Sequence, residues 1–328
     1  MDKQWQQILA AFILGLMLPG LAARLGMGKA DAIPQLQIIP PESTTESIEP
    51  QDPEPYRIPV LSMDGQVVFM ELDAYIVGVV LAEMPASFEP EALKAQAVVA
   101  RTYALKRVAE GIRHPQGAVC TDPGCCQAYI SPEEYQKDRG NLSDILKITI
   151  AVEATAGQVL TYNGELAEAT YFSCSGGRTE DAAAVWGTDI PYLQSVDSPG
   201  EEQALPYRKT ISFTAAEFAG ALGRELSGQP EDWLGVVTYT QGGGVATMVV
   251  AGISYSGVRL RRLLGLNSTA FTMTVADGMI LITTLGKGHR VGMSQYGADA
   301  MAVTGSTCQQ ILCHYYPGTK IDKMDAIG

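Results

Sequence analysis

The stretch YIVGVVLAEMPASFEPEALKAQAVVARTYAL, residues 75–105, decides the fold of this chain. It contains two apolar helical segments that are interrupted at Glu83-Met84-Pro85. Pro85 disfavours the α conformation at Met84, so the first helix is expected to end there. Glu83 therefore ends an almost wholly apolar segment, close to Met84 and Phe88, where a carboxylate is poorly solvated. Such burial raises the pKa of a carboxyl group, which makes a glutamic acid a proton donor at neutral pH.

The helix that follows has clear boundaries. Pro90 suits the first helical position, Glu91 places an acid in the first turn, and Gly111 suits the end. Lys94 and Arg101 are seven residues apart, so at ~100° per residue they lie within ~20° of each other around the helix. They form one cationic stripe on a mostly small-residue, apolar helix. The same pattern also fits a buried helical hairpin with charges that reach the surface, and both interpretations stay open here.

Length and charge limit the classes of protein to consider. At 328 residues the chain can bury a large core, in one large domain or two moderate ones. The formal net charge is −13 and no stretch is strongly basic. Nucleic acid is therefore not expected as a partner, because contacts to phosphates need clustered Lys and Arg.

The N-terminal part differs in composition from the rest. Residues 8–23 form an apolar run that spans ~24 Å as a helix, compared with ~30 Å for the hydrocarbon core of a bilayer. We expect residues 1–27 to be a signal anchor, and a cleaved signal peptide is the alternative. Residues 28–57 hold six prolines and an acidic run, which predicts an extended linker. The remainder is expected outside the cytoplasm, held at the cell membrane by a single pass.

The folded part is expected over residues 58–325, and the sequence predicts turns within it. Asp64-Gly65 and Asn163-Gly164 lie between apolar runs and predict two hairpins. Asp73 suits the N-cap of the first helix, and residues 142–153 predict a further helix.

Strand-like patterns dominate a later region. Thr214 and Glu217 fit a capping box for a short helix, and several apolar, β-branched runs follow, so a β-rich lobe is expected at about residues 207–284. We therefore predict an α+β fold, in which the helical segment that carries Glu83 packs with mainly antiparallel β-structure. Two lobes around a cleft are one arrangement that fits this pattern.

A Pro/Gly-rich loop after the second helix carries one histidine and three cysteines, namely His114, Cys120, Cys125 and Cys126. Soft thiolates with one imidazole suit tetrahedral zinc. The spacing is not that of a C-x-x-C knuckle, and adjacent ligands at Cys125 and Cys126 strain the geometry. A loop disulfide from Cys120 to Cys125 or Cys126 is the alternative, and both remain open.

Two further segments carry polar groups on glycine-rich loops. SCSGGRT, residues 173–179, places a glycine pair among hydroxyls, which either exposes backbone N–H groups to a ligand or forms an ordinary strand-end turn. GKGHRVGMSQYGADAMA, residues 286–302, is a glycine-rich loop that enters a helix. Its polar candidates are His289, Ser294, Gln295 and Tyr296.

Taken together, three segments resemble the stage II sporulation protein D family, which includes the amidase-enhancer relatives. They are residues 75–105, YFSCSGGRT (171–179) with VWGTDIPYLQSVDSP (185–199), and GKGHRVGMSQYGADAMAVTG (286–305) with ILCHYYPGT (311–319). The combination is specific, although each piece alone is weak, and the resemblance covers roughly residues 58–320.

The resemblance implies a peptidoglycan lytic transglycosylase that acts during engulfment of the forespore, on glycan strands stripped of their stem peptides. It makes Glu83 the catalytic acid. The substrate-binding candidates that go with it are Lys94, Arg101, Ser175, His289, Ser294, Gln295 and Tyr296. Family members with a zinc after the second helix imply His114, Cys120, Cys125 and Cys126 as ligands of a structural zinc, with no cofactor for the chemistry. Arg290 departs from the family pattern, since a glycine is more usual there.

The implied chemistry needs one carboxylate. Glycoside hydrolysis usually uses two, whereas in a lytic transglycosylase the C6 hydroxyl of muramic acid replaces water as the nucleophile. Glu83 would protonate the glycosidic oxygen and then act as base for that hydroxyl, which gives a 1,6-anhydro end. Lys94 and Arg101 are expected to face substrate rather than Glu83, because their charges would lower its pKa.

Two rival functions remain in view. The first is a non-catalytic wall-binding module that enhances a partner amidase. The second is a metallo-hydrolase that uses His114, His289 or His314 with Glu83, although the spacings match no metalloprotease helix motif. The expected partners are glycan strands, a sporulation amidase and membrane proteins between mother cell and forespore.

Overall fold

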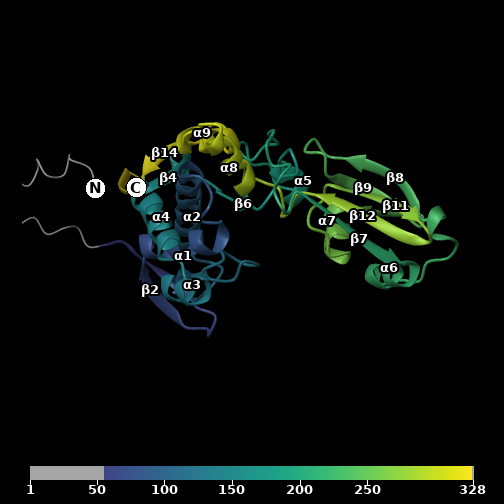
Figure 1. Ribbon diagram of the computed structural model, residues 1–328, viewed down its shortest axis with the longest axis horizontal. Coiled ribbons are helices and arrows are strands. Elements are labelled where there is room, and N and C mark those ends of the chain that lie inside the picture. Colours follow the sequence, from purple (N-terminus) through teal and green to yellow (C-terminus); the bar gives the residue numbers. More distant parts are fainter. Residues whose placement is uncertain (1–54, 327–328) are drawn as a thin grey trace, which may run out of the picture. The chain divides into compact units, whose positions relative to one another are not determined.

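The computed structural model describes residues 55–326, which belong to the compact unit Pro53–Gly328. The expected anchor (1–27) and nearly all of the expected linker (28–57) lie outside the described residues. Within the part of the chain that is described, no helix is both long and apolar enough to cross a membrane. Helices and short sheets alternate along this part, which confirms the α+β fold class (Figure 1).

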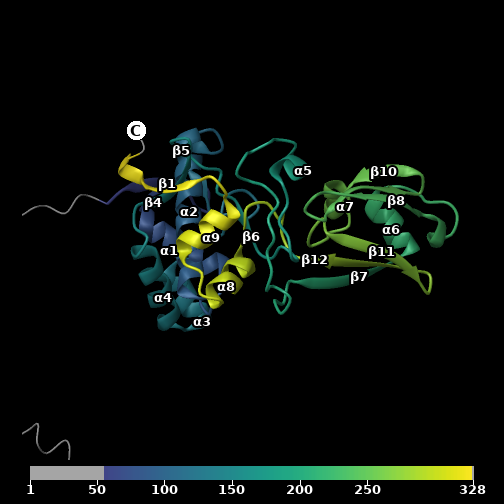
Figure 2. The same cartoon turned by 90° about the horizontal axis from the view of Figure 1, so that it is seen from above.

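The first hydrophobic core surrounds the two helices of the opening stretch. α1 (Leu72–Glu83) is almost wholly buried and ends where Met84 turns extended before Pro85. α2 (Pro90–Glu110) ends at Gly111, which has a left-handed φ of 66°. Both boundaries confirm the prediction from sequence. Three further helices pack against α2 (Figure 2): α4 (Leu142–Glu153), α8 (Gln295–Val303) and α9 (Cys308–Tyr315).

Small sheets and shorter helices complete this part. The sheets have the strand orders β2-β1-β3, β14-β4-β5 and β13-β6. Their strands are β1 (Arg57–Leu61), β2 (Val67–Glu71), β3 (Val119–Cys120), β4 (Gln158–Tyr162), β5 (Glu165–Leu166), β6 (Tyr171–Phe172), β13 (Met293–Ser294) and β14 (Lys320–Lys323). The two short helices are α3 (Pro132–Arg139) and α5 (Ala182–Trp186).

The predicted turns are confirmed, and one predicted cap is wrong. β1 and β2 form a hairpin around Asp64-Gly65, and β4 pairs with β5 across Asn163-Gly164. Asp73 does not cap α1, because the helix already begins at Leu72 with Glu71 at the N-cap. Asp73 instead lies in the first turn of α1 and binds Arg101.

A second hydrophobic core is built from strands with β-branched and aromatic residues. Two three-stranded antiparallel sheets, β11-β12-β7 and β10-β9-β8, enclose it together with two helices. The strands are β7 (Arg208–Thr214), β8 (Leu234–Tyr239), β9 (Val245–Val250), β10 (Ile253–Ser256), β11 (Phe271–Ala276) and β12 (Met279–Leu285). The helices are α6 (Ala215–Leu222), which begins with the predicted Thr214–Glu217 capping box, and α7 (Gly257–Leu263).

A buried ion pair between Arg290 and Glu180 links the β8–β9 turn with the loop before α8. Arg290 has a left-handed φ of 67°, a conformation that usually favours glycine. Its guanidinium donates to the carbonyls of Ser175 and Gly242, each at 2.7 Å, and to Oε1 of Glu180 at 3.1 Å. Glu180 in turn accepts from the backbone N–H of Gly244 at 2.9 Å. These bonds hold Arg290 in a backbone conformation that usually favours glycine.

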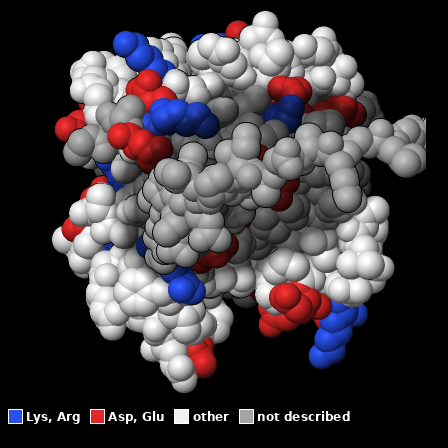
Figure 3. All heavy atoms as spheres, turned by 90° about the vertical axis from the view of Figure 1, so that its left-hand side faces the viewer, with Lys and Arg blue, Asp and Glu red and all other residues white. Residues whose placement is uncertain are grey.

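Charged side chains are mixed in sign on the face drawn in Figure 3. Among the described side chains visible there, basic and acidic groups alternate, and no extended basic patch is seen.

Candidate active site

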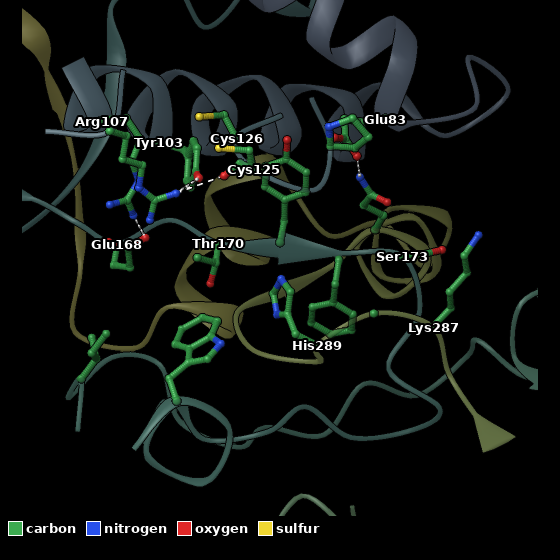
Figure 4. A pocket seen from close by; sticks show the side chains of 18 of the residues that line it. Glu83, Tyr103, Arg107, Cys125, Cys126, Glu168, Thr170, Ser173, Lys287 and His289 are labelled. Carbon is green, nitrogen blue, oxygen red and sulfur yellow. Dashed lines mark hydrogen bonds and ion pairs between the residues drawn. The ribbon is translucent and has the colours of Figure 1, made fainter. Parts of the chain in front are cut away.

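A cleft of about 880 Å³ opens beside the end of α1 (Figure 4). Its volume lies within the usual range for small-ligand sites. Its lining comes from the end of α1, from α2, from the cysteine loop, from residues 168–173 and 186–190, and from residues 287–295. The cleft therefore does not lie between the two hydrophobic cores, because no residue of 207–284 lines it.

Glu83 stands at this cleft as the last residue of α1. Its Oε1 accepts a hydrogen bond from the backbone N–H of Ala128 at 2.9 Å, and its Oε2 accepts one from Nε2 of Gln295 at 3.3 Å. Burial raises the pKa of Glu83, although hydrogen bonds from Ala128, Gln295 and the Tyr171 side chain act to lower it. A partly buried carboxyl group of this kind can hold a proton at a pH where an exposed one has lost it.

His289 lies in the same cleft between two aromatic rings. Its ring centroid is 5.6 Å from that of Phe172 and 5.5 Å from that of Trp186. Burial, and then the positive charge of Arg261, lowers the pKa of His289 to about 4, so the ring is neutral at physiological pH. Nδ1 accepts from the backbone N–H of Val291 at 3.1 Å, which leaves the ring proton on Nε2. His289 is therefore a hydrogen-bond donor in the cleft and not a base.

The cationic stripe of α2 does not reach this cleft, which corrects the expectation for Lys94 and Arg101. Arg101 is fully buried, and its guanidinium donates to Oδ1 of Asp73 at 2.8 Å and to the carbonyl of Gln158 at 3.2 Å. Lys94 is bound to Glu91 at 2.6 Å and lines a separate cavity of about 530 Å³. Both cations are used in the protein's own ion pairs, so neither contacts a ligand in the Glu83 cleft.

Two serine candidates also have structural partners. Ser175 is fully buried, and its Oγ donates to Glu201 at 2.9 Å. Ser294 is buried at the N-cap of α8 and accepts from the N–H of Gly297 at 3.2 Å. Neither Ser175 nor Ser294 has an exposed surface in the cleft, so the structure gives no support to the substrate contacts expected of them.

The remaining candidates of these two loops have structural roles as well. Tyr296 packs edge-on against Phe88, with ring centroids 5.0 Å apart, and does not line the cleft. The N–H groups of the glycine pair are also satisfied internally, since Gly176 donates to Glu201 and Gly177 to Oγ of Ser175. Tyr296 thus supports the loop that follows Glu83 rather than a ligand.

His114, Cys120, Cys125 and Cys126 converge beside the cleft, and one potential ligand atom of each lies within 4.8 Å of the others. Nε2 of His114 is 3.3 Å from Sγ of Cys125 and 3.6 Å from Sγ of Cys126. A tetrahedral zinc with Zn–N of about 2.0 Å and Zn–S of about 2.3 Å would hold such atoms about 3.6 Å apart. The six cysteines of the chain are unpaired in the structure, so the alternative loop disulfide is not formed.

Several cleft residues were not anticipated from sequence. Arg107 of α2 binds Glu168 and Glu110 at one end of the cleft. Arg113 also lines the cleft, and its Nη1 donates to the carbonyl of Cys125 at 3.0 Å. These residues lie on the polar end of a helix and in an irregular loop, where no sequence pattern marked them.

Other missed residues lie inside motifs that the sequence did mark. Tyr171 begins the YFSCSGG segment, and Lys287 lies in the GKGH loop. Trp186, which ends α5, lies in the segment VWGTDIPYLQSVDSP. The only sequence signal for these cleft residues was their position next to the polar residues of those motifs.

The fold and the cleft define a class of α+β protein in which a largely buried carboxylic acid shares a cleft with aromatic rings, an amide donor and a few charged side chains. Comparison with known proteins identifies the family. The family model described as stage II sporulation protein matches residues 64–162. The chain belongs to the stage II sporulation protein D family.

Three relatives show how far the similarity extends. The chain is 44% identical over 278 residues to stage II sporulation protein D of Bacillus subtilis, covering 83% of this chain and 80% of the relative. It is 42% identical over 289 residues to stage II sporulation protein D of Bacillus amyloliquefaciens, with 86% and 83% covered. It is also 29% identical over 303 residues to the amidase enhancer of Bacillus subtilis, with 74% of this chain and 40% of that protein covered.

Proposed function

We propose that this protein is a peptidoglycan lytic transglycosylase. It would cleave the MurNAc–GlcNAc bond of glycan strands stripped of stem peptides and leave 1,6-anhydroMurNAc ends. One observation carries the proposal: Glu83 lies in the cleft with its pKa raised by burial, and the other carboxylate that lines the cleft, Glu168, is bound to Arg107. A single acid that can both give and take a proton suits this reaction better than hydrolysis by two carboxylates.

The reaction uses Glu83 twice. The protonated carboxyl donates its proton to the glycosidic oxygen, the bond from C1 of MurNAc to that oxygen breaks, and GlcNAc leaves with a free hydroxyl. The Glu83 carboxylate then takes the proton of the MurNAc C6 hydroxyl while O6 bonds to C1. Atoms and charges balance without water, and Glu83 regains its proton.

The other cleft groups support binding of a sugar. The exposed part of Trp186, 42% of its surface, offers a flat apolar face beside His289. Nε2–H of His289 and the amide of Gln295 are donors suited to sugar hydroxyls or acetamido carbonyls. Lys287 and Arg113 also line the cleft, and neither forms an ion pair with a carboxylate among the described residues. Their charges suit the lactyl carboxylate of a stripped MurNAc.

His114, Cys120, Cys125 and Cys126 would hold a structural zinc ion. The donor set of three thiols and one imidazole fits the tetrahedral preference of zinc, and the nitrogen–sulfur separations fit it as well. Four protein ligands leave no open position for substrate, so the ion would stabilise the loop and take no part in the chemistry.

The cellular setting follows from the family. Its members are named for stage II of sporulation, which supports a role in engulfment of the forespore. Residues 1–27 would anchor the chain in the cell membrane, with the catalytic domain facing the wall between mother cell and forespore. A sporulation amidase would be a partner, as the name of the amidase enhancer relative suggests.

Digestion of stripped glycan strands tests the proposal. Wild-type protein should release 1,6-anhydromuramic ends, and Glu83→Gln should release none above background. Ordinary reducing ends from the wild type would rule out a transglycosylase and indicate a hydrolase. The same product analysis separates the proposal from a metallo-hydrolase, because a hydrolase of either kind adds water and leaves ordinary reducing ends.

A non-catalytic enhancer of an amidase is the second candidate, and the 29% identity to the amidase enhancer favours it. Strong stimulation of a sporulation amidase by the Glu83→Ala variant would support this candidate. If Glu83→Ala does not stimulate the amidase and the wild type releases anhydro ends, the enhancer function is excluded.

A further inference from the structure

The second core lines no part of the cleft, yet it holds the loop that carries His289. On one side of His289, the backbone N–H of Gly288 donates to the carbonyl of Asn267, between α7 and β11, at 2.9 Å. On the other side, Nη2 of Arg290 donates to the carbonyl of Gly242, in the β8–β9 turn, at 2.7 Å. His289 therefore lies between two residues that are bound to the second core.

The β8–β9 turn, Gly242-Gly243-Gly244, fits closely against its neighbours at two of its three glycines. A Cβ at Gly242 would overlap the carbonyl oxygen of Thr179, and a Cβ at Gly244 would overlap Oε1 of Glu180. A Cβ at Gly243 would meet nothing within 4 Å. The first and third glycines are thus required for the approach of the turn, whereas the second faces open space.

The turn closes over the ion pair of Glu180 and Arg290. The two side chains are 1% and 2% exposed. Oε1 of Glu180 accepts from Nη1 of Arg290 at 3.1 Å and from the N–H of Gly244 at 2.9 Å, and the backbone N–H of Glu180 donates to the carbonyl of Arg290 at 2.6 Å. A buried charge that loses its partner is costly. The pair therefore keeps the backbone at Arg290 in one arrangement.

We propose that the Gly242-Gly243-Gly244 turn positions His289 in the cleft, acting through Arg290 and without touching the substrate. The inference rests on the proposed function, in which Nε2–H of His289 donates to the sugar. The imidazole ring stands 5.6 Å from the ring of Phe172 and 5.5 Å from that of Trp186 (Figure 4). A shift of the loop would turn the donor away from the sugar, whereas a donor that is already in place loses little freedom when the glycan binds.

Nuclear magnetic resonance of the full chain tests the position of His289 without any substrate. The ring currents of Phe172 and Trp186 make the imidazole signals sensitive to small displacements. The chain has three histidines, so comparison with His289→Phe identifies these signals. Gly242→Ala should shift them. Unchanged signals in a folded Gly242→Ala protein would overturn the proposal.

The middle of the same turn provides a matched control. Gly243 has a φ of 77°, which asparagine tolerates better than most residues, and its side chain would face open space. Gly243→Asn should therefore leave the His289 signals and the kinetics as in the wild type. Equal shifts in Gly242→Ala and Gly243→Asn would contradict a role for the close approach at Gly242.

Kinetics test the consequence for binding. Gly242→Ala should raise KM for stripped glycan about 3- to 10-fold, the affinity that one neutral hydrogen bond contributes, with kcat within about twofold of the wild type. His289→Phe keeps an aromatic ring but removes the donor, so Gly242→Ala should add almost nothing in that background. An unchanged KM, or increases that multiply in the double variant, would overturn the proposal.

A second variant decides the question if Gly242→Ala does not fold. Arg290→Lys keeps the buried charge, but one ammonium group cannot replace the guanidinium that reaches the carbonyls of Ser175 and Gly242 together. It should shift the His289 signals and raise KM, and unchanged signals would overturn the proposal. If the wild type forms no anhydro ends, the proposed function fails, whereas the His289 signals still decide whether the turn positions the ring.

Discussion

The backbone N–H of Ala128 lies 2.9 Å from Oε1 of Glu83. Ala128 follows Cys126 by two residues, so the segment that holds the acid is the end of the loop that carries the histidine–cysteine cluster. The position of the carboxylate therefore depends on the conformation of that loop as well as on α1. Through this dependence the proposed zinc site would influence the proposed chemistry without any contact between metal and substrate.

Removal of zinc should loosen this loop. Cys120→Ser, or dialysis against a strong chelator, should reduce the zinc content from one ion per chain to none, lower Tm, and reduce transglycosylase activity at least about tenfold. Cys313→Ser changes an exposed cysteine outside the cluster and should leave zinc content and Tm as in the wild type. Elemental analysis and thermal unfolding provide the readout. Wild-type protein that binds no zinc would contradict the assignment.

Glu83→Gln should stabilise the protein at neutral pH. Below the usual carboxyl pKa of about 4.3, Glu83 is protonated in both the folded and the unfolded chain and contributes no difference. As the pH rises, the unfolded chain ionises first, because burial raises the folded pKa, and the wild type loses stability until the folded group ionises too. Tm of the variant should therefore exceed that of the wild type at pH 7, by about 2–4 °C per kcal/mol. The gain should vanish near pH 4, and a gain that is equal at both values would contradict the raised pKa.

Asp73→Asn tests whether Arg101 is structural. The substitution leaves a fully buried guanidinium without its charged partner, although two carbonyls still accept from it. Because the Asp73 side chain is 44% exposed, we expect a modest loss, about 1–2 kcal/mol in the free energy of unfolding. KM for glycan should not change. Urea unfolding with steady-state kinetics measures both, and a raised KM at unchanged stability would indicate a substrate contact instead.

Gly78→Ala should displace the segment after the cysteine loop. A Cβ at Gly78 would enter the ring of Tyr129 and lie 2.9 Å from the carbonyl of Ile130, so the segment must shift. We expect a loss of about 1–3 kcal/mol in stability, and lower activity through the neighbouring Ala128. The matched control is Gly220→Ala in α6, where a Cβ meets nothing within 4 Å, and which should gain up to about 1 kcal/mol. Equal effects of the two substitutions would contradict the steric explanation.

Much of the fold could be read from local signals. The break at Pro85, the caps at Pro90 and Gly111, and the Asn-Gly and Asp-Gly turns all fix backbone dihedral angles over a few residues. Each of these predictions is confirmed by the element boundaries. The predicted N-cap at Asp73 was wrong because acidic residues are favoured both at the N-cap and in the first turn of a helix. The sequence pattern therefore does not distinguish the two positions.

The candidate site could be anticipated only in part. Glu83, Gln295 and His289 lie in motifs whose apolar or glycine-rich surroundings isolate a few polar groups, and the structure brings all three to the cleft. Lys94 and Arg101 share a helix face, as their spacing requires, yet the face turns away from the cleft. Helical periodicity gives the relative direction of two side chains, whereas their absolute direction depends on what packs around the helix.

The sequence by itself determined where α1 stops, that a carboxylic acid is left at its end, and that a histidine and three cysteines share one loop. Those features depend on neighbours in the chain. Only the tertiary structure decided that Asp73 neutralises Arg101, that Ala128 and Gln295 bond to Glu83, and that the cleft excludes the second core. These contacts join residues 28 to 212 positions apart, and the balance of burial and hydrogen bonding that sets a pKa exists only once such residues meet.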